Sequence, residues 1–407
     1  MHTLKNIIYK YYENVVFTCL LLYGLTFLID IKINFLTTAF VFNIIFCIFL
    51  QKKQPLCLNY TNEFKYFIIT VIFFFILTCL STIIAGGSLS EYKSRLISPI
   101  LGLLIFLILP VNKKRILLLF LSFAIPLSIN ALFVIYQFYQ GDLGRPTGFS
   151  NHHYMMLAVT NTLILPIMLS LGLHKSQLFP KLKILFLLLF LVNVPAIIFE
   201  NTRIIWIELA IILPFIILSC IKSKIKAFSA IILLLICIVS FFAISPSSIN
   251  RFSGISDTDY KNQSNYERIL MWQSASEMFM DYPIAGVGIG NYHEQYMNNY
   301  RSPLSREDQA HPHNVLLTFL SETGILGTLG YLLLFIYLYY YTIKNYIVKK
   351  DVFSLAFLSC LLAFSINSLT DSIFCQIGYK GNTSLFWIIT TMYFILNNHL
   401  ITFKQKD

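Results

Sequence analysis

The residues best suited to chemistry stand where the character of the chain changes sharply. A polar stretch of 67 residues, 246–312, ends at Pro312, and His313 and Asn314 then precede a long apolar segment. At the start of a helix, the positive end of the helix dipole favours a neutral imidazole that can accept a proton. A neutral histidine is a usable general base, and the neighbouring Asn314 can orient a hydroxyl group. The junction therefore predicts acid–base chemistry.

The composition places this junction in a membrane protein. Hydrophobic residues make up 57% of the 407 residues and charged residues 12%, and the mean hydropathy of +0.71 is outside the range of a soluble domain. We therefore expect an all-α polytopic membrane protein with about 12 transmembrane helices and one long outer loop carrying short helices. Segments long enough to cross a hydrocarbon core of about 30 Å are predicted at 13–31, 34–50, 66–86, 94–110, 115–139, 152–173, 182–199, 203–221, 225–245, 313–341, 353–373 and 382–401.

The chain divides into three parts of one integral membrane domain. Residues 1–245 hold transmembrane helices 1–9, residues 246–312 form the outer loop, and residues 313–407 hold helices 10–12 and a tail. The first apolar segment has no small-residue cleavage site before Asp30, so we interpret it as a retained span. Short loops on the side of the termini carry 19 of the 30 basic residues, which predicts that both termini are cytoplasmic.

Two further compositional features exclude other classes of protein. The net charge of +11 is scattered through short loops instead of gathered on one face, so membrane topology explains it better than nucleic-acid binding does. None of the eight cysteines lies in the long loop, and most lie in predicted spans, so no disulfide framework or cysteine metal site is implied.

Two arginines stand at the outer surface. Arg203 begins the predicted span 203–221, and Arg268 opens a helix predicted over 266–281. A guanidinium is always charged and its planar fork matches phosphate oxygens, so the two could hold a pyrophosphate. The alternatives are that Arg203 is an interfacial anchor for lipid headgroups and that Arg268 is an ordinary solvated charge.

Glycines recur on both sides of the junction. Gly286, Gly288 and Gly290 could let the backbone approach a ligand closely, or could simply form a tight turn that returns the chain to the membrane. Gly324 and Gly327 belong to a stripe of small residues on which a neighbouring helix could pack. Between them and His313 lies Glu322, whose depth in the predicted helix requires protein or water around it.

Metal binding is the competing interpretation of the histidines. His311 and His313 flank a proline, and His293 lies upstream. No carboxylate cluster or regular ligand spacing accompanies them, so we predict no metal.

The spacing of His313, Asn314, Gly324 and Gly327 resembles the HNx9GxxG signature of the bacterial O-antigen ligase family, and the match is complete. Arg203 resembles the family's arginine at the start of an outer-leaflet helix, although its RxxxL form would have leucine where this chain has Ile207.

Two more segments carry the resemblance, which covers mostly residues 200–330 and the twelve-span layout. Arg268, followed by Trp272, Pro283 and the glycine run 286–290, is similar to the family's second arginine segment and glycine turn. Arg145, followed by the segment 148–153, resembles the outer segment before a middle span.

The resemblance implies that the chain transfers O-antigen polysaccharide from undecaprenyl pyrophosphate to lipid A-core in lipopolysaccharide biosynthesis. The reaction would take place among membrane lipids on the periplasmic face of the bacterial inner membrane, which makes the long outer loop periplasmic. No metal, nucleotide sugar or other cofactor is implied.

The family also implies roles for individual residues. Arg203 and Arg268 would bind the pyrophosphate and stabilise its growing charge, and His313 would deprotonate the acceptor hydroxyl in an inverting transfer. Gly324 and Gly327 belong to the structural motif. Substrate binding is expected of Asn314, Gly286, Gly288, Gly290, His311 and Arg145.

Three other functions stay open. An O-antigen polymerase does the same bond chemistry with a lipid-linked repeat as acceptor, but such enzymes often carry Arg-x15-Gly, and neither Arg203 nor Arg268 has glycine at that spacing. A lipid-linked oligosaccharide flippase should carry charges along the middle of the bundle, whereas these charges gather at one outer surface. A related transferase that glycosylates proteins is the third.

Overall fold

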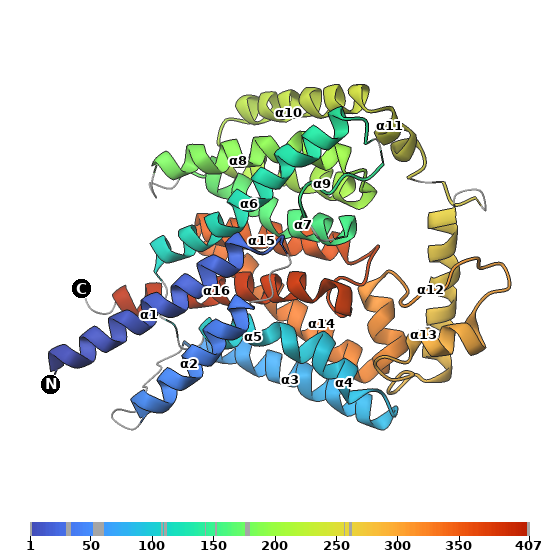
Figure 1. The fold of residues 1–407 in the computed structure, drawn as a ribbon, viewed down its shortest axis with the longest axis horizontal. Coiled ribbons are helices and arrows are strands. Elements are labelled where there is room, and N and C mark those ends of the chain that lie inside the picture. Colours follow the sequence, from blue (N-terminus) through green and yellow to red (C-terminus); the bar gives the residue numbers. More distant parts are fainter. Residues whose placement is uncertain are drawn as a thin grey trace.

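Long apolar helices lie side by side and make up most of the protein (Figure 1). The computed structural model describes residues 2–29, 34–51, 61–106, 109, 112–142, 144–150, 153–175, 180–255, 257–259 and 263–404. In these residues it contains helices and turns and no strand, which confirms the predicted all-α polytopic membrane fold. The elements are α1 (His2–Leu25), α2 (Phe35–Gln51), α3 (Asn62–Ile84), α4 (Leu89–Tyr92), η1 (Lys93–Ile97), η2 (Ser98–Ile100), α5 (Leu101–Phe106), α6 (Lys113–Tyr139), α7 (Tyr154–Leu173), α8 (Pro180–Phe199), α9 (Arg203–Cys220), α10 (Lys224–Ile244), α11 (Pro246–Ser253), α12 (Gln263–Asp281), α13 (Tyr292–Gln295), η3 (Tyr296–Tyr300), α14 (Val315–Lys349), α15 (Val352–Asn367), η4 (Ile377–Tyr379) and α16 (Lys380–Lys404).

Seven of the described helices, α3, α6, α7, α8, α9, α10 and α14, are long and apolar enough to cross a membrane. Helix α15 and the segment Phe35–Ile45 of α2 are shorter apolar helices. All of these coincide with predicted spans. The total of twelve spans stays a prediction.

The predicted span 94–110 is wrong as a single helix. The chain there passes through the π-helical turn η1 and the 3-10 turn η2 before α5 begins, and residues 107, 108, 110 and 111 lie outside the described part. Pro99, in η2, has no N–H to donate, so it cannot continue a regular α-helix. The break brings Arg95 of η1 toward the interior.

The outer loop carries its own helices at one end of the bundle. Helix α12 runs across that end and packs against α14, while the first residues of α1 and the last of α16 lie at the opposite end (Figure 1). The predicted loop helix 266–281 is thus part of α12, which ends two residues before Pro283. Every element that bears a candidate site residue reaches this end.

Helix α14 is interrupted at Gly324, and the segment that contains the glycine run forms backbone hydrogen bonds with the helix at that point. Gly324 has φ 59° and ψ −157°, so hydrogen bonds of the helix are interrupted there. The segment 283–288 takes their place: Val287 and Gly288 N–H groups donate to the carbonyls of Ser321 and Glu322 at 2.8 and 2.9 Å. In return, the Ile325 N–H donates to the Pro283 carbonyl at 2.8 Å. Ser321, Glu322 and Gly324 are buried, so their backbone groups cannot bond water and the pairing keeps the break stable.

Only glycine fits where these two segments meet. A Cβ atom on Gly286 would lie 2.5 Å from backbone atoms of Glu322, and one on Gly324 would lie 2.5 Å from backbone atoms of Ile284. Both glycines also have positive φ. Ser81 of α3 closes the contact by donating its hydroxyl to the Ala285 and Thr323 carbonyls at 3.0 and 2.9 Å.

Glu322 lies immediately before the break and is paired. Its carboxylate accepts from Arg95 at 3.1 Å and from the Gly290 N–H at 3.1 Å, while Arg95 also contacts Glu91 at 2.9 Å. Arg95 and the Gly290 N–H therefore supply the protein surroundings that the sequence predicts for Glu322. The pair ties η1 to α14 and to the end of the glycine run.

We expect Gly324→Ala to destabilise the protein by at least about 2 kcal/mol, because the new Cβ would meet backbone and the residue would hold a positive φ. Gly381→Ala is the matched control, since its Cβ would lie 3.7 Å from Phe27 in an ordinary contact. Thermal unfolding of both variants in detergent measures the difference. Equal melting temperatures would contradict the structural role of the glycine.

Candidate active site

A cavity of about 650 Å³ opens at the end of the bundle where α12 lies. Its wall comes from the segment before α7 and the start of α7, from the turn before α9 and the start of α9, from α11 and α12, and from the segments before α14 and α16. Four arginines and the two histidines of the His-Pro-His segment face it: Arg145, Arg203, Arg251, Arg268, His311 and His313.

Two of the arginines are held by the chain around them. Arg203, the first residue of α9, donates to the Gly254 carbonyl at 2.9 Å and to the Ser264 hydroxyl at 3.2 Å. Arg251 of α11 donates its Nε–H to the Asn201 carbonyl at 2.9 Å. These neutral acceptors fix the guanidinium groups without cancelling their charges.

The other two arginines have fewer polar contacts. The Arg145 guanidinium lies over the Tyr154 ring, 4.0 Å from its centroid, in a cation–π contact. Arg268 reaches the Ser264 hydroxyl at 3.5 Å, and its buried Nε has no hydrogen-bond partner in the protein. A buried donor without a partner is costly, so Arg268 is suited to receive one from a ligand.

The cavity carries excess positive charge. In the described part of the chain, none of the four arginines forms an ion pair with a carboxylate. Burial, Arg145 and Arg203 lower the pKa of Arg251 to about 10. Of the carboxylates in the wall, Glu267 accepts from Ser305 and from the Arg306 N–H instead. The arrangement favours a multiply charged anion that accepts several guanidinium hydrogen bonds.

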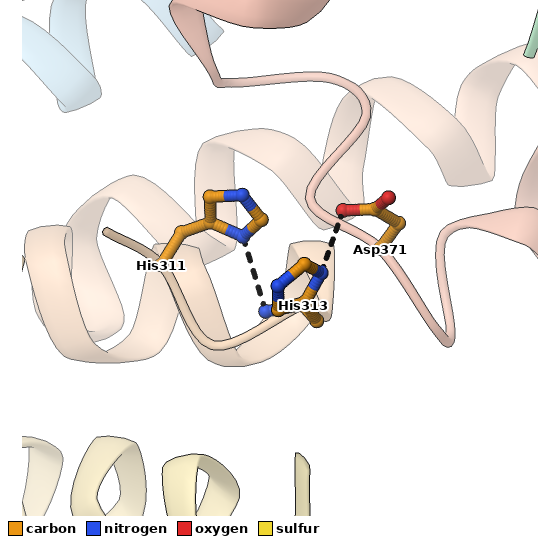
Figure 2. Close-up of side chains that lie close together, drawn as sticks. All are labelled: His311, His313 and Asp371. Carbon is orange, nitrogen blue, oxygen red and sulfur yellow. Dashed lines mark hydrogen bonds and ion pairs between the residues drawn. The ribbon is translucent and has the colours of Figure 1, made fainter. Parts of the chain in front are cut away.

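His313 lies beside these arginines in a strained backbone conformation. Its φ is 50°, and it precedes Asn314, the N-cap of α14, so it stands outside the helix. Its Nδ1 lies 3.2 Å from Oδ1 of the fully buried Asp371 (Figure 2). Non-glycine residues with positive φ are uncommon and gather at functional sites, where the surroundings hold them.

Asp371 is held as an anion. Burial raises its pKa, but the hydrogen bonds from His313 and from the Tyr379 hydroxyl, together with the electrostatic attraction of the two nearby imidazole rings, outweigh burial and hold the pKa well below its usual range. The Ser372 N–H also donates to Asp371 at 2.8 Å. An ionised carboxylate can only accept, so His313 places its hydrogen on Nδ1. Nε2 is then free to take a proton, and the side chain is 24% exposed toward the cavity.

His311 supports the same segment. Its Nδ1 accepts from the His313 N–H at 3.3 Å, and the two rings are 4.2 Å apart (Figure 2). Burial and His313 lower the pKa of His311 to about 3. It is neutral at physiological pH and adds no charge to the arginine cavity.

The same three side chains could hold a metal ion. The ligand atoms of His311, His313 and Asp371 lie within 4.8 Å of one another, and a set of three protein ligands is typical of catalytic zinc. Against this, Arg268 and Arg95 lie near enough to lower the pKa of His311 electrostatically, and a divalent cation would add charge beside them. The expectation of a metal-free reaction stays a prediction.

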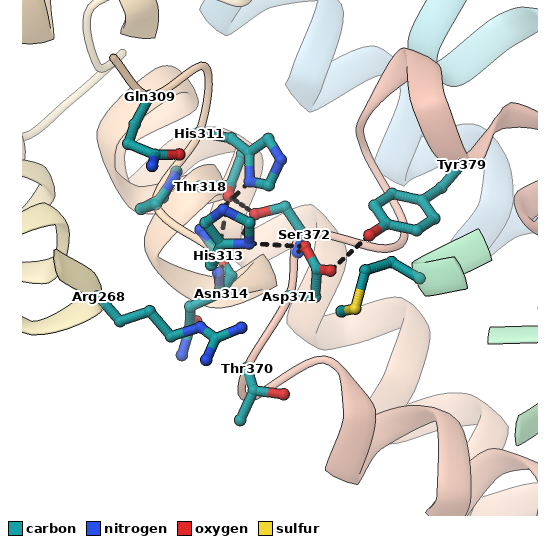
Figure 3. A network of polar contacts seen from close by, with 12 residues as sticks. Arg268, Gln309, His311, His313, Asn314, Thr318, Thr370, Asp371, Ser372 and Tyr379 are labelled. Atoms are coloured by element: carbon teal, nitrogen blue, oxygen red, sulfur yellow. Dashed lines mark hydrogen bonds and ion pairs between the residues drawn. The ribbon is translucent and has the colours of Figure 1, made fainter. Parts of the chain in front are cut away.

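The structure brings together Arg145, Arg203, Arg268, His311 and His313 of the residues predicted from the sequence. Figure 3 shows Arg268 extending toward the segment that carries His313 and Asp371.

Other predicted residues do not reach the cavity wall. Asn314 caps α14 by accepting from the Leu317 N–H at 3.0 Å and donates to the Leu369 carbonyl at 3.0 Å. Gly286 packs against α14, Gly288 and Gly290 pack against the segment 87–91, and Gly324 and Gly327 lie within α14. The glycine run therefore has the turn role that the sequence left as the alternative to ligand binding.

Sequence reasoning missed Arg251, Asp371 and Tyr379. The predicted span 353–373 placed Asp371 inside a membrane helix, but α15 ends at Asn367 and the acid lies in the turn that follows. An acidic residue at the end of an apolar segment was a usable signal. Arg251 lies in the short helix α11, which was treated as part of a loop.

Residues 184–332 match the family model described as O-antigen ligase. The matched segment runs from α8 to the middle of α14 and includes Arg203, Arg251, Arg268 and His313, whereas Asp371 lies outside it. No curated protein matches the chain.

We expect the purified protein to bind inorganic pyrophosphate, measured by calorimetry at low ionic strength. Arg251→Gln should weaken binding at least about tenfold, because charge-assisted hydrogen bonds contribute about 1.5–3 kcal/mol. Arg301→Gln is the matched control, since this outer-loop arginine bonds the Ser305 carbonyl and does not face the cavity. Equal losses in both variants would mean that only general surface charge attracts the anion.

Proposed function

We propose, on the premise that residues 184–332 match the O-antigen ligase family model, that the chain transfers O-antigen polysaccharide from undecaprenyl pyrophosphate to lipid A-core. The observation that carries the proposal is the cavity in which four arginines surround a histidine paired with a buried aspartate. It combines a site for a pyrophosphate with a site for a general base.

The arginines supply the electrostatic part of the reaction. When the bond between the anomeric carbon and the phosphate oxygen breaks, negative charge grows on the departing undecaprenyl pyrophosphate. Arg203, Arg251 and Arg268 come from α9, α11 and α12, so they can contact the pyrophosphate from different sides. Fixed charges aimed at a developing anion stabilise the transition state more than the ground state.

His313 and Asp371 supply the proton transfer. Nε2 of His313 takes the proton of the acceptor hydroxyl as its oxygen attacks the anomeric carbon, and Asp371 stabilises the imidazolium that forms. The attack comes from the side opposite the departing phosphate. The anomeric configuration is therefore inverted, without a covalent enzyme intermediate.

The position of the cavity fits lipid substrates. It lies at the end of the bundle that bears α12, opposite the beginning of α1 (Figure 1). We place this end at the periplasmic face of the bacterial inner membrane. Donor and acceptor would both enter from the outer leaflet, with their lipid chains remaining among membrane lipids.

The main alternative is an O-antigen polymerase, which uses a lipid-linked repeat as acceptor. The family match and the cavity fit both enzymes, because the bond chemistry is the same. The missing Arg-x15-Gly spacing after Arg203 and Arg268 favours the ligase. A flippase is less well supported, because the arginines converge at one end.

A deletion strain should show the difference on a lipopolysaccharide gel. We expect bare core while long lipid-linked chains accumulate, and wild type should restore the ladder. His313→Ala should not restore it, and Asp371→Asn should lower transfer by about 10²-fold or more, since losing or misorienting a general base costs this much. His293→Ala is the control, because this exposed outer-loop histidine does not line the cavity.

The outcomes separate the candidates. Core carrying a single repeat in the deletion strain would identify a polymerase. A full ladder with His313→Ala would remove the base assignment.

Transfer by purified protein should be unchanged by a chelator. The arginines supply the positive charge and His313 takes the proton, so neither step in the proposed mechanism needs a metal. The measurement is the transfer rate before and after extensive treatment with EDTA. Loss of activity that zinc or magnesium restores would show instead that His311, His313 and Asp371 bind a metal.

A further inference from the structure

Glu208 is a fully buried carboxyl group in the interior of the bundle. It lies five residues after Arg203, about 7.5 Å along α9 at the rise of an α-helix, and it does not line the cavity. Its Oε2 accepts from the Thr162 hydroxyl of α7 at 2.7 Å and from the Asn367 amide of α15 at 3.4 Å. The Asn367 amide also donates to the Thr162 oxygen at 2.9 Å. Three helices therefore meet at one polar cluster, Glu208–Thr162–Asn367.

Two acceptor oxygens in this cluster have no protein donor. They are Oε1 of Glu208 and Oδ1 of Asn367, and both are buried. Two oxygens that only accept cannot bond each other. A proton on Oε1 would make Glu208 a hydrogen-bond donor. Asn367 contacts Glu208, and its Oδ1 could accept that hydrogen bond because it has no other donor in the protein.

The electrostatic surroundings of Glu208 also favour a neutral carboxyl group. Within the described residues, no lysine, arginine or histidine forms an ion pair with Glu208. An isolated anion in an apolar interior is far more costly than a neutral hydrogen-bonded acid. Glu322 differs from Glu208 in this respect, because this other buried carboxylate forms an ion pair with Arg95.

The cluster is connected to the site through one turn. The Asn367 carbonyl accepts from the N–H groups of Thr370 and Asp371 at 3.0 and 3.2 Å. The same turn holds the start of α14, because the Val315 N–H donates to the Ser368 carbonyl at 2.9 Å. The turn that begins at Asn367 therefore holds both Asp371 and the chain that follows His313.

We propose that Glu208 carries a proton and, through Asn367, positions the turn that holds Asp371 against His313. Glu208 is thus a positioning residue for the transfer reaction, and this role rests on the proposed function. The neutral carboxyl group bonds Thr162 and Asn367 at once and locks α7, α9 and α15 together beneath the cavity.

The decisive comparison is between a neutral isostere and an apolar residue at this position. Glu208→Gln keeps one acceptor and one donor without charge, so it should retain transfer within about threefold of wild type. Glu208→Leu removes both bonds and should lower kcat at least about tenfold, as expected when a base is held loosely. The donor is an undecaprenyl-pyrophosphate-linked repeat and the acceptor is purified lipid A-core.

The KM for the donor should not change in Glu208→Leu, because the four arginines stay in place. Inorganic pyrophosphate binding checks that the variant is folded. If Glu208→Leu does not fold, Thr162→Val decides, because it is nearly isosteric, removes one donor to Glu208 and should lower kcat in the same way. Ser359→Ala is the control: its buried hydroxyl bonds only the Leu355 carbonyl within α15.

Infrared spectroscopy tests the proton without any activity. The difference spectrum of wild type minus Glu208→Gln at neutral pH should contain the carbonyl stretch of a protonated carboxyl group. A carboxylate band in its place would overturn the proposal. Glu208→Gln as inactive as Glu208→Leu would overturn it as well, because an ionised or proton-transferring Glu208 would then be required.

The proposed function and the positioning role of Glu208 are overturned by different results. No transfer by wild-type protein with these substrates would remove the proposed function and the positioning role with it. The infrared result would still decide the protonation of Glu208.

Discussion

The cost of placing charge next to an apolar helix bundle governs how this protein is built. Each ionisable group in the described interior meets that cost in its own way. Glu322 is paired with Arg95 and with the Gly290 N–H. Glu208 bonds only neutral groups, which fits a protonated acid. The arginines of the cavity have no carboxylate partner, so their charge is available to a ligand. The place where the bundle leaves charge uncompensated is therefore the place where an anion should bind.

The fold and part of the site could be predicted because they depend on local properties of the chain. Apolar length predicts helices, and the predicted spans coincide with the long helices of the structure. His313 and Arg203 stand out by residue type at the ends of apolar segments and Arg268 near the start of a predicted loop helix, and all three face the cavity. The errors have local causes too. Pro99 interrupts the segment 94–110, and α15 ends at Asn367, which leaves Asp371 outside the helix.

What the sequence could not provide are contacts between distant segments. Asp371 is 58 residues from His313, and Arg95 is 227 residues from Glu322. No spacing rule connects such pairs; the packing of α14 against α3 and against α15 brings them together. The glycine run illustrates the same limit. Its residue types allow either a ligand contact or a tight turn, and only the backbone pairing with the break at Gly324 distinguishes the two.

We propose that the arginine cavity holds the donor's pyrophosphate and that the anomeric carbon of the first sugar faces His313. A cryo-electron microscopy structure with a lipid-linked O-antigen repeat bound would show this geometry. We expect phosphate oxygens within hydrogen-bond distance of Arg203, Arg251 and Arg268. We also expect the first sugar to lie between the pyrophosphate and His313, leaving room for the acceptor hydroxyl. A pyrophosphate bound outside the cavity, or a sugar turned away from His313, would rule out this arrangement.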